Sequence, residues 1–109
     1  MPNYSKGDVV LIRYPFSDLS GTKVRPAIVV NAPHISQDLL IVPLTSRTTS
    51  LLPGEFVLAN WQTSGLHIAS AVKRGLYTVQ EQLCLKTVGH LTTKDSKQLE
   101  HSLKQWLGL

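Results

Sequence analysis

The sequence is poor in cysteine and in aromatic residues, and it lacks long apolar runs. Its one cysteine, Cys84, stands between two leucines, so we expect no internal disulfide and a small buried side chain in a reducing compartment. The longest apolar runs, such as residues 9–12 and 39–44, are far shorter than the roughly 20 residues of a bilayer-spanning helix. The N-terminal residues have no apolar stretch of the kind that forms a signal peptide. These absences predict a soluble cytoplasmic protein that has no membrane partner.

Acidic charge is also scarce, with seven Asp and Glu against eleven Lys and Arg, which gives a formal net charge of +4. In a chain of 109 residues, which has the length of one compact domain over residues 1–109, this is a mild basic excess. It favours a polyanionic or acidic partner, although a charge that only keeps the protein in solution explains it equally well. The cations are spread singly apart from Lys73 and Arg74, so any nucleic-acid site must be assembled by the fold.

Residues that bind metals or act as nucleophiles show no characteristic spacing. The seven carboxylates are scattered, with no two within four residues, and the four histidines show no ligand pattern such as His-x-x-x-His. One cysteine cannot build a zinc site. The glycines form no phosphate-binding loop, and the chain has no Gly-x-Ser-x-Gly motif. The sequence therefore predicts no metal and no cofactor.

Short aliphatic and β-branched runs, bounded by turn residues, predict a chain made mostly of strands. We expect strands at residues 9–14, 27–30, 39–44 and 55–58, two more within 67–79, and an exposed loop over 15–24, while 80–91 fits a helix or a strand.

The C-terminal segment has the pattern of a helix. Thr92 and Asp95 have the spacing of a helix-capping box, and Gly108 can end the helix. One apolar stripe runs between them, formed by Leu99, Leu103, Trp106 and Leu107. Many short strands and one terminal helix predict an α+β protein, a small β-barrel with a C-terminal α-helix.

Two consecutive predicted strands carry the polar residues of a candidate active site. Arg25 stands at the start of one strand and Thr45 at the end of the next, and the short connection favours antiparallel neighbours. We therefore expect Arg25 and Thr45 to converge at one edge of the sheet. A guanidinium can grip two phosphate oxygens while a hydroxyl donates to a third. A solvated arginine and an ordinary turn explain the same residues, so the spacing alone leaves both interpretations open.

The order of the motifs resembles that of the MazF/PemK-like toxins of bacterial type II toxin–antitoxin systems. The matching segments are Gly-Asp-Val-Val at 7–10 with Lys-Val-Arg-Pro-Ala-Ile-Val-Val at 23–30, Ile-Val-Pro-Leu-Thr-Ser at 41–46, Ser-Ala-Val-Lys at 70–73 and Val-Gly-His-Leu-Thr at 88–92. The resemblance spans almost the whole chain, and its most specific part is the pair formed by the Arg-Pro-Ala strand and the Pro-Leu-Thr strand end.

The resemblance implies a fold, an activity and partners. The fold is a small SH3-like barrel (CcdB/PemK-like) with a C-terminal helix, and the protein is a homodimer. The activity is sequence-specific, metal-independent cleavage of single-stranded RNA, in which the 2′-oxygen of the RNA attacks the phosphate and leaves 2′,3′-cyclic phosphate and 5′-hydroxyl ends. The family's catalytic arginine and threonine fall on Arg25 and Thr45. The implied protein partner is a cognate acidic antitoxin with a disordered tail that covers the RNA site.

RNA contacts are expected from the predicted loop 15–24, the hydroxyl cluster after Thr45 and the nearby cations. Phe16 has the chemistry to stack on an unpaired base, although an anchoring role for the loop is equally compatible. The expected RNA-binding residues are Phe16, Lys23, Ser46, Arg47, Lys73 and Arg74. Trp61 fits either the core or a dimer interface, while Trp106 is expected to pack the helix onto the barrel.

One position departs from the family pattern, and one other class of function fits the fold. Ser70 stands where some relatives have an aspartate that assists proton transfer. His67 is a candidate substitute, although a strand histidine that only points to solvent is the simpler interpretation. The alternative function is a non-catalytic, CcdB-like gyrase poison, because residues 106–109 superficially resemble the Trp-Gly tail of those proteins. A nucleic-acid-binding barrel without activity is a third interpretation.

Overall fold

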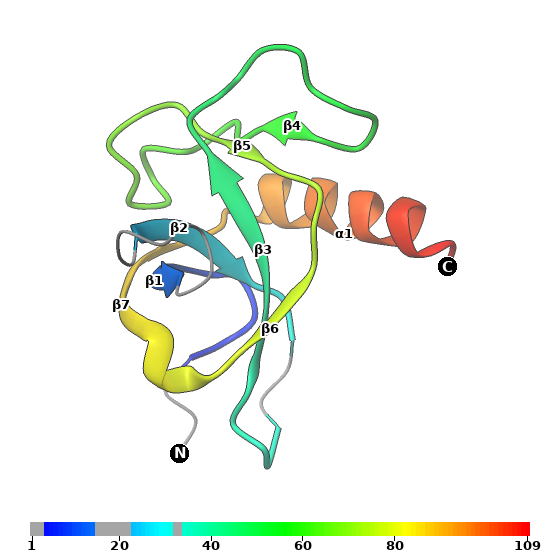
Figure 1. Ribbon diagram of the computed structural model, residues 1–109. Helices are drawn as coiled ribbons and strands as arrows, with labels where there is room; N and C mark the ends of the chain where they lie inside the picture. The colour runs from blue at the N-terminus through cyan, green and yellow to red at the C-terminus, as the bar shows by residue number, and fades with distance from the viewer. Residues whose placement is uncertain (1–3, 15–22, 32–33) are drawn as a thin grey trace.

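The fold is a curled antiparallel sheet with one long helix packed against it (Figure 1). The computed structural model describes residues 4–14, 23–31 and 34–109. The strands are β1 (Asp8–Tyr14), β2 (Lys23–Val29), β3 (Leu39–Thr45), β4 (Phe56–Val57), β5 (Ala71–Val72), β6 (Tyr77–Val79) and β7 (Cys84–His90), followed by the helix α1 (Thr93–Leu107). A short 3₁₀ helix, η1 (Glu81–Leu83), precedes β7.

The strands pair in the order β4-β5-β3-β2-β1-β7, and β6 also pairs with β3. Within the described part of the chain no pairing joins β4 to β7, so the sheet is barrel-like but open. The predicted α+β class and the C-terminal helix are confirmed. The ambiguous segment 80–91 resolves into η1 and β7, because β1 offers its free edge to β7.

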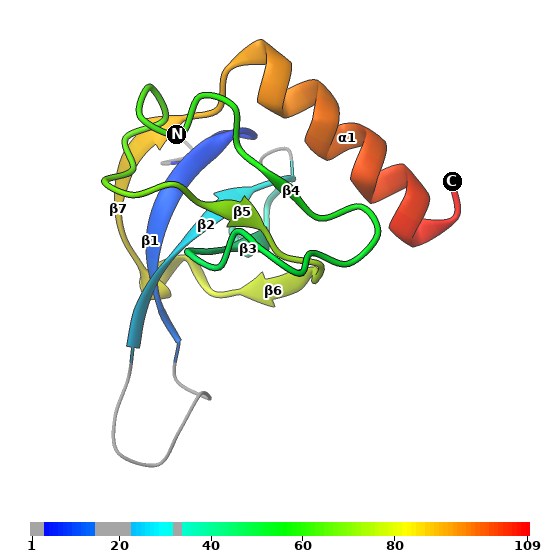
Figure 2. The same cartoon turned by 90° about the horizontal axis from the view of Figure 1, so that it is seen from above.

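The middle parts of the three long central strands are aliphatic, because there both faces of the sheet are largely buried. Successive residues point alternately into two apolar clusters, one containing Val9, Ile28 and Val42 and the other Val10, Ala27 and Ile41. Continuous aliphatic runs are the expected sequence of strands buried in this way. The helix covers the first of these clusters, and Figure 2 shows it lying along one side of the sheet.

Strand β2 begins earlier than its sequence indicates, at Lys23 instead of Ala27, so the predicted strand 27–30 and loop 15–24 both had wrong boundaries. Pro26 stands just before the predicted strand 27–30, but it pairs with Leu11 inside β2. The described ladder between β2 and β3 stops at Ala27, so the segment containing Pro26 is paired only with β1. A strand paired on one side tolerates a residue that has no N–H.

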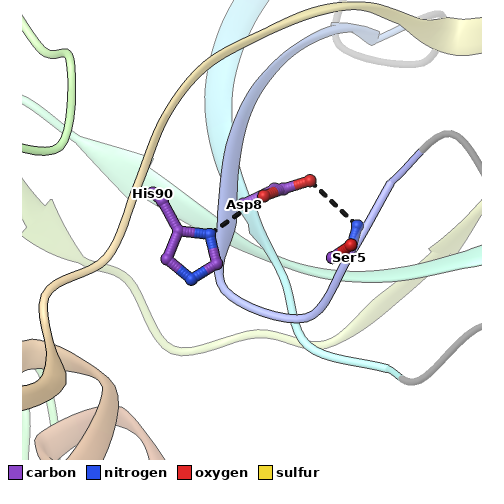
Figure 3. Close-up of polar contacts among 3 residues, drawn as sticks. All are labelled: Ser5, Asp8 and His90. Carbon is purple, nitrogen blue, oxygen red and sulfur yellow. Dashed lines mark hydrogen bonds and ion pairs between the residues drawn. The ribbon is translucent and has the colours of Figure 1, made fainter.

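The Gly-Asp motif at 7–8 forms a structural corner at the start of β1 (Figure 3). The Asp8 carboxylate accepts hydrogen bonds from the Ser5 backbone N–H (2.8 Å) and from His90 Nδ1 (3.0 Å). Gly7 donates to Val29 O and accepts from Leu91 N–H. Gly7 has a φ of 94°, a left-handed conformation that favours glycine. This motif therefore ties β1 to β2 and β7, far along the strand from Arg25.

Cys84 is buried at the start of β7, as predicted. Burial, and to a lesser extent the charge of Glu81, raises the pKa of its thiol to about 11. Such a thiol stays protonated at neutral pH and is chemically inert.

Helix α1 begins at a Thr92 cap and ends at Gly108, as predicted. Thr92 accepts the Asp95 N–H, but the Asp95 carboxylate does not complete a capping box. It is 2% exposed and accepts the backbone N–H groups of Ala59 and Asn60, at 2.9 and 3.0 Å. Asp95 therefore joins the helix to a segment more than thirty residues earlier in the chain.

The apolar stripe of the helix packs as expected except at its end. Leu99 is buried, and Leu103 and Trp106 pack against the cluster beneath the helix. Leu107 was expected in the stripe, but it is 52% exposed. Trp106 donates its indole N–H to Pro53 O (3.0 Å), so it fastens the helix to the barrel, and Trp61 also packs against the same cluster.

We predict that Asp95→Ala destabilises the fold strongly, because it leaves two partly buried backbone N–H groups without their acceptor. The expected loss is about 2–4 kcal/mol, which lowers the melting temperature of a domain of this size by roughly 10–25 °C. Thermal unfolding followed by circular dichroism measures it. The control is Glu100→Ala, an exposed residue paired with Lys104, for which we expect less than about 0.5 kcal/mol. Equal melting temperatures for the two variants would contradict the role of Asp95.

Candidate active site

The register between β2 and β3 brings Arg25 and Thr45 together. Ala27 lies opposite Pro43 in the last described pair of this ladder, and Arg25 and Thr45 each stand two residues beyond that pair on their own strands. Both residues line one cavity of about 310 Å³, which we call the first cavity. On its other side Thr45 pairs with Ala71 of β5, so the position of its backbone is fixed by the sheet.

Thr45 and Arg25 are both able to donate hydrogen bonds to a ligand. The Thr45 hydroxyl accepts the Arg47 N–H at 3.1 Å, which fixes its orientation in a turn. Among the described residues no acceptor takes the proton of this hydroxyl, and none forms an ion pair with the exposed Arg25. An anion in the first cavity therefore meets a guanidinium and a hydroxyl donor, a combination suited to a phosphate.

Four further polar residues line the first cavity, namely Ser46, His67, Ser70 and Lys86. Ser70 is 2% exposed and its hydroxyl donates to Ile68 O at 2.9 Å, so it has a structural role in a turn. His67 is exposed at the cavity. Lys86 was missed by the sequence analysis, because a face can be assigned to it only once 84–90 is known to be a strand.

The wall of the first cavity depends on a close approach between two glycines. Gly65 lies against the backbone of Val88 and Gly89, and Gly89 lies against that of Ser64 and Gly65. A methyl group on either glycine would overlap a carbonyl group of the other segment. Gly65 also has a φ of 89°, which favours glycine. The two glycines thus allow the segment that carries His67 to pack directly against β7.

The predicted RNA-binding residues divide between two places. Ser46 lines the first cavity, whereas Arg47, Lys73 and Arg74 line a separate cavity of about 370 Å³, the second cavity. Lys23 is exposed at the start of β2 and lines neither cavity. Phe16 and residues 15–22 of the predicted loop lie outside the described residues.

Glu55 lies in the second cavity together with these three cations. Its carboxylate accepts the Leu52 N–H and the Arg74 N–H, both at 2.8 Å. Partial burial acts to raise the pKa of Glu55, but the two backbone hydrogen bonds and the charges of Arg47 and Lys73 outweigh it, so the pKa is lowered. Glu55 therefore stays ionised at neutral pH and holds the turn before β4 against the segment after β5.

The described residues form neither a metal-binding cluster nor a membrane-spanning helix. In the described ranges 4–14, 23–31 and 34–109, no group of three or more His, Cys, Asp or Glu side chains is placed to hold a metal ion. In the same ranges no helix has the length and apolar character needed to cross a bilayer.

Residues 5–107 match the family described as PemK-like, MazF-like toxin of type II toxin–antitoxin system. The chain belongs to this family, and the resemblance predicted from its motifs is confirmed. No curated protein sequence matches the chain.

Solved structures share the fold. A chain of the MazE–MazF crystal structure (Form-II) from Deinococcus radiodurans has a TM-score of 0.79 at 16% identity, covering 97% of this chain and 96% of that one. The toxin MazF-mt6 from Mycobacterium tuberculosis has a TM-score of 0.72 at 18% identity, covering 94% of this chain and 97% of that one. An endoribonuclease from a mycobacterial species, in complex with its cognate antitoxin, has a TM-score of 0.76 at 16% identity, covering 97% of this chain and 96% of that one.

The lowered pKa of Glu55 predicts a pH-dependent contribution to stability. Because the folded pKa lies below the ordinary value of 4.5, the contribution is fully present above that value and is lost as pH falls through the folded pKa. We expect Glu55→Gln to be less stable than the wild type at about pH 7 and the difference to shrink by about pH 3. Denaturant unfolding at both pH values measures it. An equal stability difference between wild type and variant at both pH values would refute the lowered pKa of Glu55. Glu100→Gln is the matched exposed control.

Proposed function

We propose that the protein is the endoribonuclease toxin of a type II toxin–antitoxin system, which cleaves single-stranded RNA in the cytoplasm without a metal ion. The observation that carries this proposal is the convergence of Arg25 and Thr45 in the first cavity, where both can donate hydrogen bonds to an anion. Membership of the PemK-like, MazF-like family supports it, and so does the fold shared with a mycobacterial endoribonuclease.

The reaction needs no nucleophile from the protein. The 2′-oxygen of the ribose attacks the adjacent phosphorus as its proton leaves, and the bond from phosphorus to the 5′-oxygen breaks as that oxygen gains a proton. The products are a 2′,3′-cyclic phosphate and a 5′-hydroxyl. Negative charge builds on the non-bridging oxygens, and preorganised donors such as the Arg25 guanidinium and the Thr45 hydroxyl stabilise it. A guanidinium remains protonated under working conditions, so Arg25 acts through its charge and not as a base.

His67 is our candidate for proton transfer. Imidazoles exchange protons near neutral pH, and His67 lines the same cavity as Arg25 and Thr45. Ser70, which replaces the aspartate of some relatives, has its hydroxyl engaged with Ile68 O. Lys86 adds a second positive charge to the cavity. Ser46 and Lys23, together with Phe16, are proposed to contact the RNA on either side of the scissile phosphate.

The proposed partners follow from the family and from the charge of the chain. A cognate antitoxin with an acidic tail complements the net charge of +4, and similar folds occur in complexes of MazF with MazE. We also propose that the protein is a homodimer. The alternative of a gyrase poison acting through its C-terminal tail is disfavoured, because Trp106 packs over Gly54 and donates to Pro53 O.

We predict that Arg25→Ala and Thr45→Ala each reduce RNA cleavage about 10²–10³-fold, since each removes one donor to the transition state. Neither side chain is buried, so both variants should fold normally. The assay incubates a long single-stranded RNA with purified protein in EDTA and maps the product ends. Lys97→Ala removes an exposed helix cation that lines neither cavity, and it should cleave normally. Normal cleavage by either active-site variant would refute the assignment.

We predict that His67→Ala lowers kcat about 10²-fold or more, the contribution typical of general acid–base catalysis. It should also remove one limb of the pH–rate profile, which a merely structural role would leave in place. The pH dependence of kcat for the wild type and the variant provides the test. An unchanged profile would assign proton transfer to another group or to water.

A further inference from the structure

The position of His67 in the first cavity depends on the backbone that carries it. Its side chain is exposed there, beside those of Arg25 and Lys86. In the part of the chain that the structure describes, no residue forms a hydrogen bond or an ion pair with its imidazole. No side-chain partner therefore orients the ring, and the segment on either side of His67 decides where it can exchange a proton.

We call residues 65–70 the His67 arch, and its first end rests on β7. A methyl group on Gly89 would overlap the backbone of the segment beside Gly65, so the two segments are in direct contact. Figure 2 shows the connection between β4 and β5 passing beside β7. The Leu66 N–H donates to Trp61 O at 3.1 Å, and both side chains pack against the cluster beneath the helix. The first end of the arch is therefore fixed.

The other end of the arch is closed by Ser70. This residue is 2% exposed, and its carbonyl oxygen accepts the Leu58 N–H at 2.9 Å, which extends the ladder between β4 and β5. Its hydroxyl donates to Ile68 O, also at 2.9 Å. Ile68 follows His67 directly, so this bond turns the chain back immediately after the residue that carries the imidazole. The chain between the two fixed ends is three residues long, 67–69.

Packing contributes little to the middle of the arch. His67 is exposed, and Ile68 is 59% exposed. Segments with few buried apolar contacts open easily unless polar contacts hold them. The hydrogen bond from the Ser70 hydroxyl to Ile68 O is such a contact, and it lies inside the arch. Gly89 supplies the surface on which the first end rests.

We propose that Ser70 and Gly89 are positioning residues that fix His67 in the first cavity, where it transfers protons during RNA cleavage. Both act through the arch, because the Ser70 hydroxyl proton is engaged by Ile68 O and Gly89 has no side chain. A group that transfers a proton must lie within hydrogen-bond reach of it, so a misplacement of about 1 Å can cost on the order of 10²-fold in rate. The proposal rests on the proposed function for the reaction in which His67 takes part.

The kinetic test removes each contact separately. Ser70→Ala deletes the hydroxyl bond, and Gly89→Ala pushes the arch away from β7. We expect kcat to fall on the order of 10-fold for Ser70→Ala and about 10²-fold for Gly89→Ala, with KM little changed. The limb of the pH–rate profile that depends on His67 should remain, because the imidazole is still present. In His67→Ala protein neither change should lower kcat further, since the group that they position is gone.

Two matched controls separate positioning from loss of stability. Ser102 is a fully buried serine whose hydroxyl also donates to a backbone carbonyl, that of Gly54. Gly108 has a φ of 72°, and an added methyl there would meet no other described segment within 4 Å. Ser102→Ala and Gly108→Ala should therefore lower stability and preserve kcat. Equal losses of kcat in the controls, or equal losses with and without His67, would overturn the proposal.

Backbone order separates failure of this proposal from failure of the proposed function. NMR relaxation of the RNA-free wild type should give order parameters near 0.85 for residues 66–69, the value typical of rigid backbone. Ser70→Ala and Gly89→Ala should lower them or shift the amide signals, and Ser102→Ala should change neither. Thermal unfolding confirms that each variant is folded, and Ser70→Ala alone decides if Gly89→Ala does not fold.

The two measurements together give a decision in each case. A changed arch with no cleavage by the wild type would refute the proposed function and support the fixed position of His67. A changed arch with unchanged kcat would overturn the positioning role. Unchanged order parameters and amide signals in the variants would overturn it whether or not the wild type cleaves RNA.

Discussion

The antiparallel pairing of β3 is the constraint on which the rest of the structure depends. This strand pairs with β2 and β6 along its first part and with β5 at its end. Its last residue, Thr45, is therefore fixed by its pairing with Ala71 and lies two residues beyond the pair of Ala27 with Pro43. A hydroxyl donor is useful to a reacting phosphate only when its position is preorganised, and this ladder provides that position.

The sequence predicts this arrangement well where local pattern and chain order decide the structure. The convergence of Arg25 and Thr45 follows because consecutive strands joined by a short connection pair antiparallel. Contacts between distant segments were not predictable. Asp95 has the spacing of a cap, but its carboxylate is used by N–H groups more than thirty residues away. Likewise, Ser46 and Arg47 are neighbours in the sequence, and nothing in the sequence indicates that their side chains line different cavities.

The electrostatics of the molecule are organised locally, although its composition is only mildly basic. Two cations, Arg25 and Lys86, lie in the first cavity, and three lie in the second around the single carboxylate of Glu55. A net charge of +4 therefore understates the field that an anion meets at these two cavities. Such local fields steer association and raise the encounter rate at low ionic strength.

Helix α1 is attached at three levels to the segment 53–60. Asp95 binds the N–H groups at its far end, Ser102 donates to Gly54 O (2.7 Å), and Trp106 donates to Pro53 O. Segments joined this way open as one cooperative unit, so slow amide hydrogen exchange in the helix and in 53–60 should share one opening free energy. The helix thus holds the β4 region in place. The wall of the second cavity remains formed for as long as the helix stays packed against the barrel.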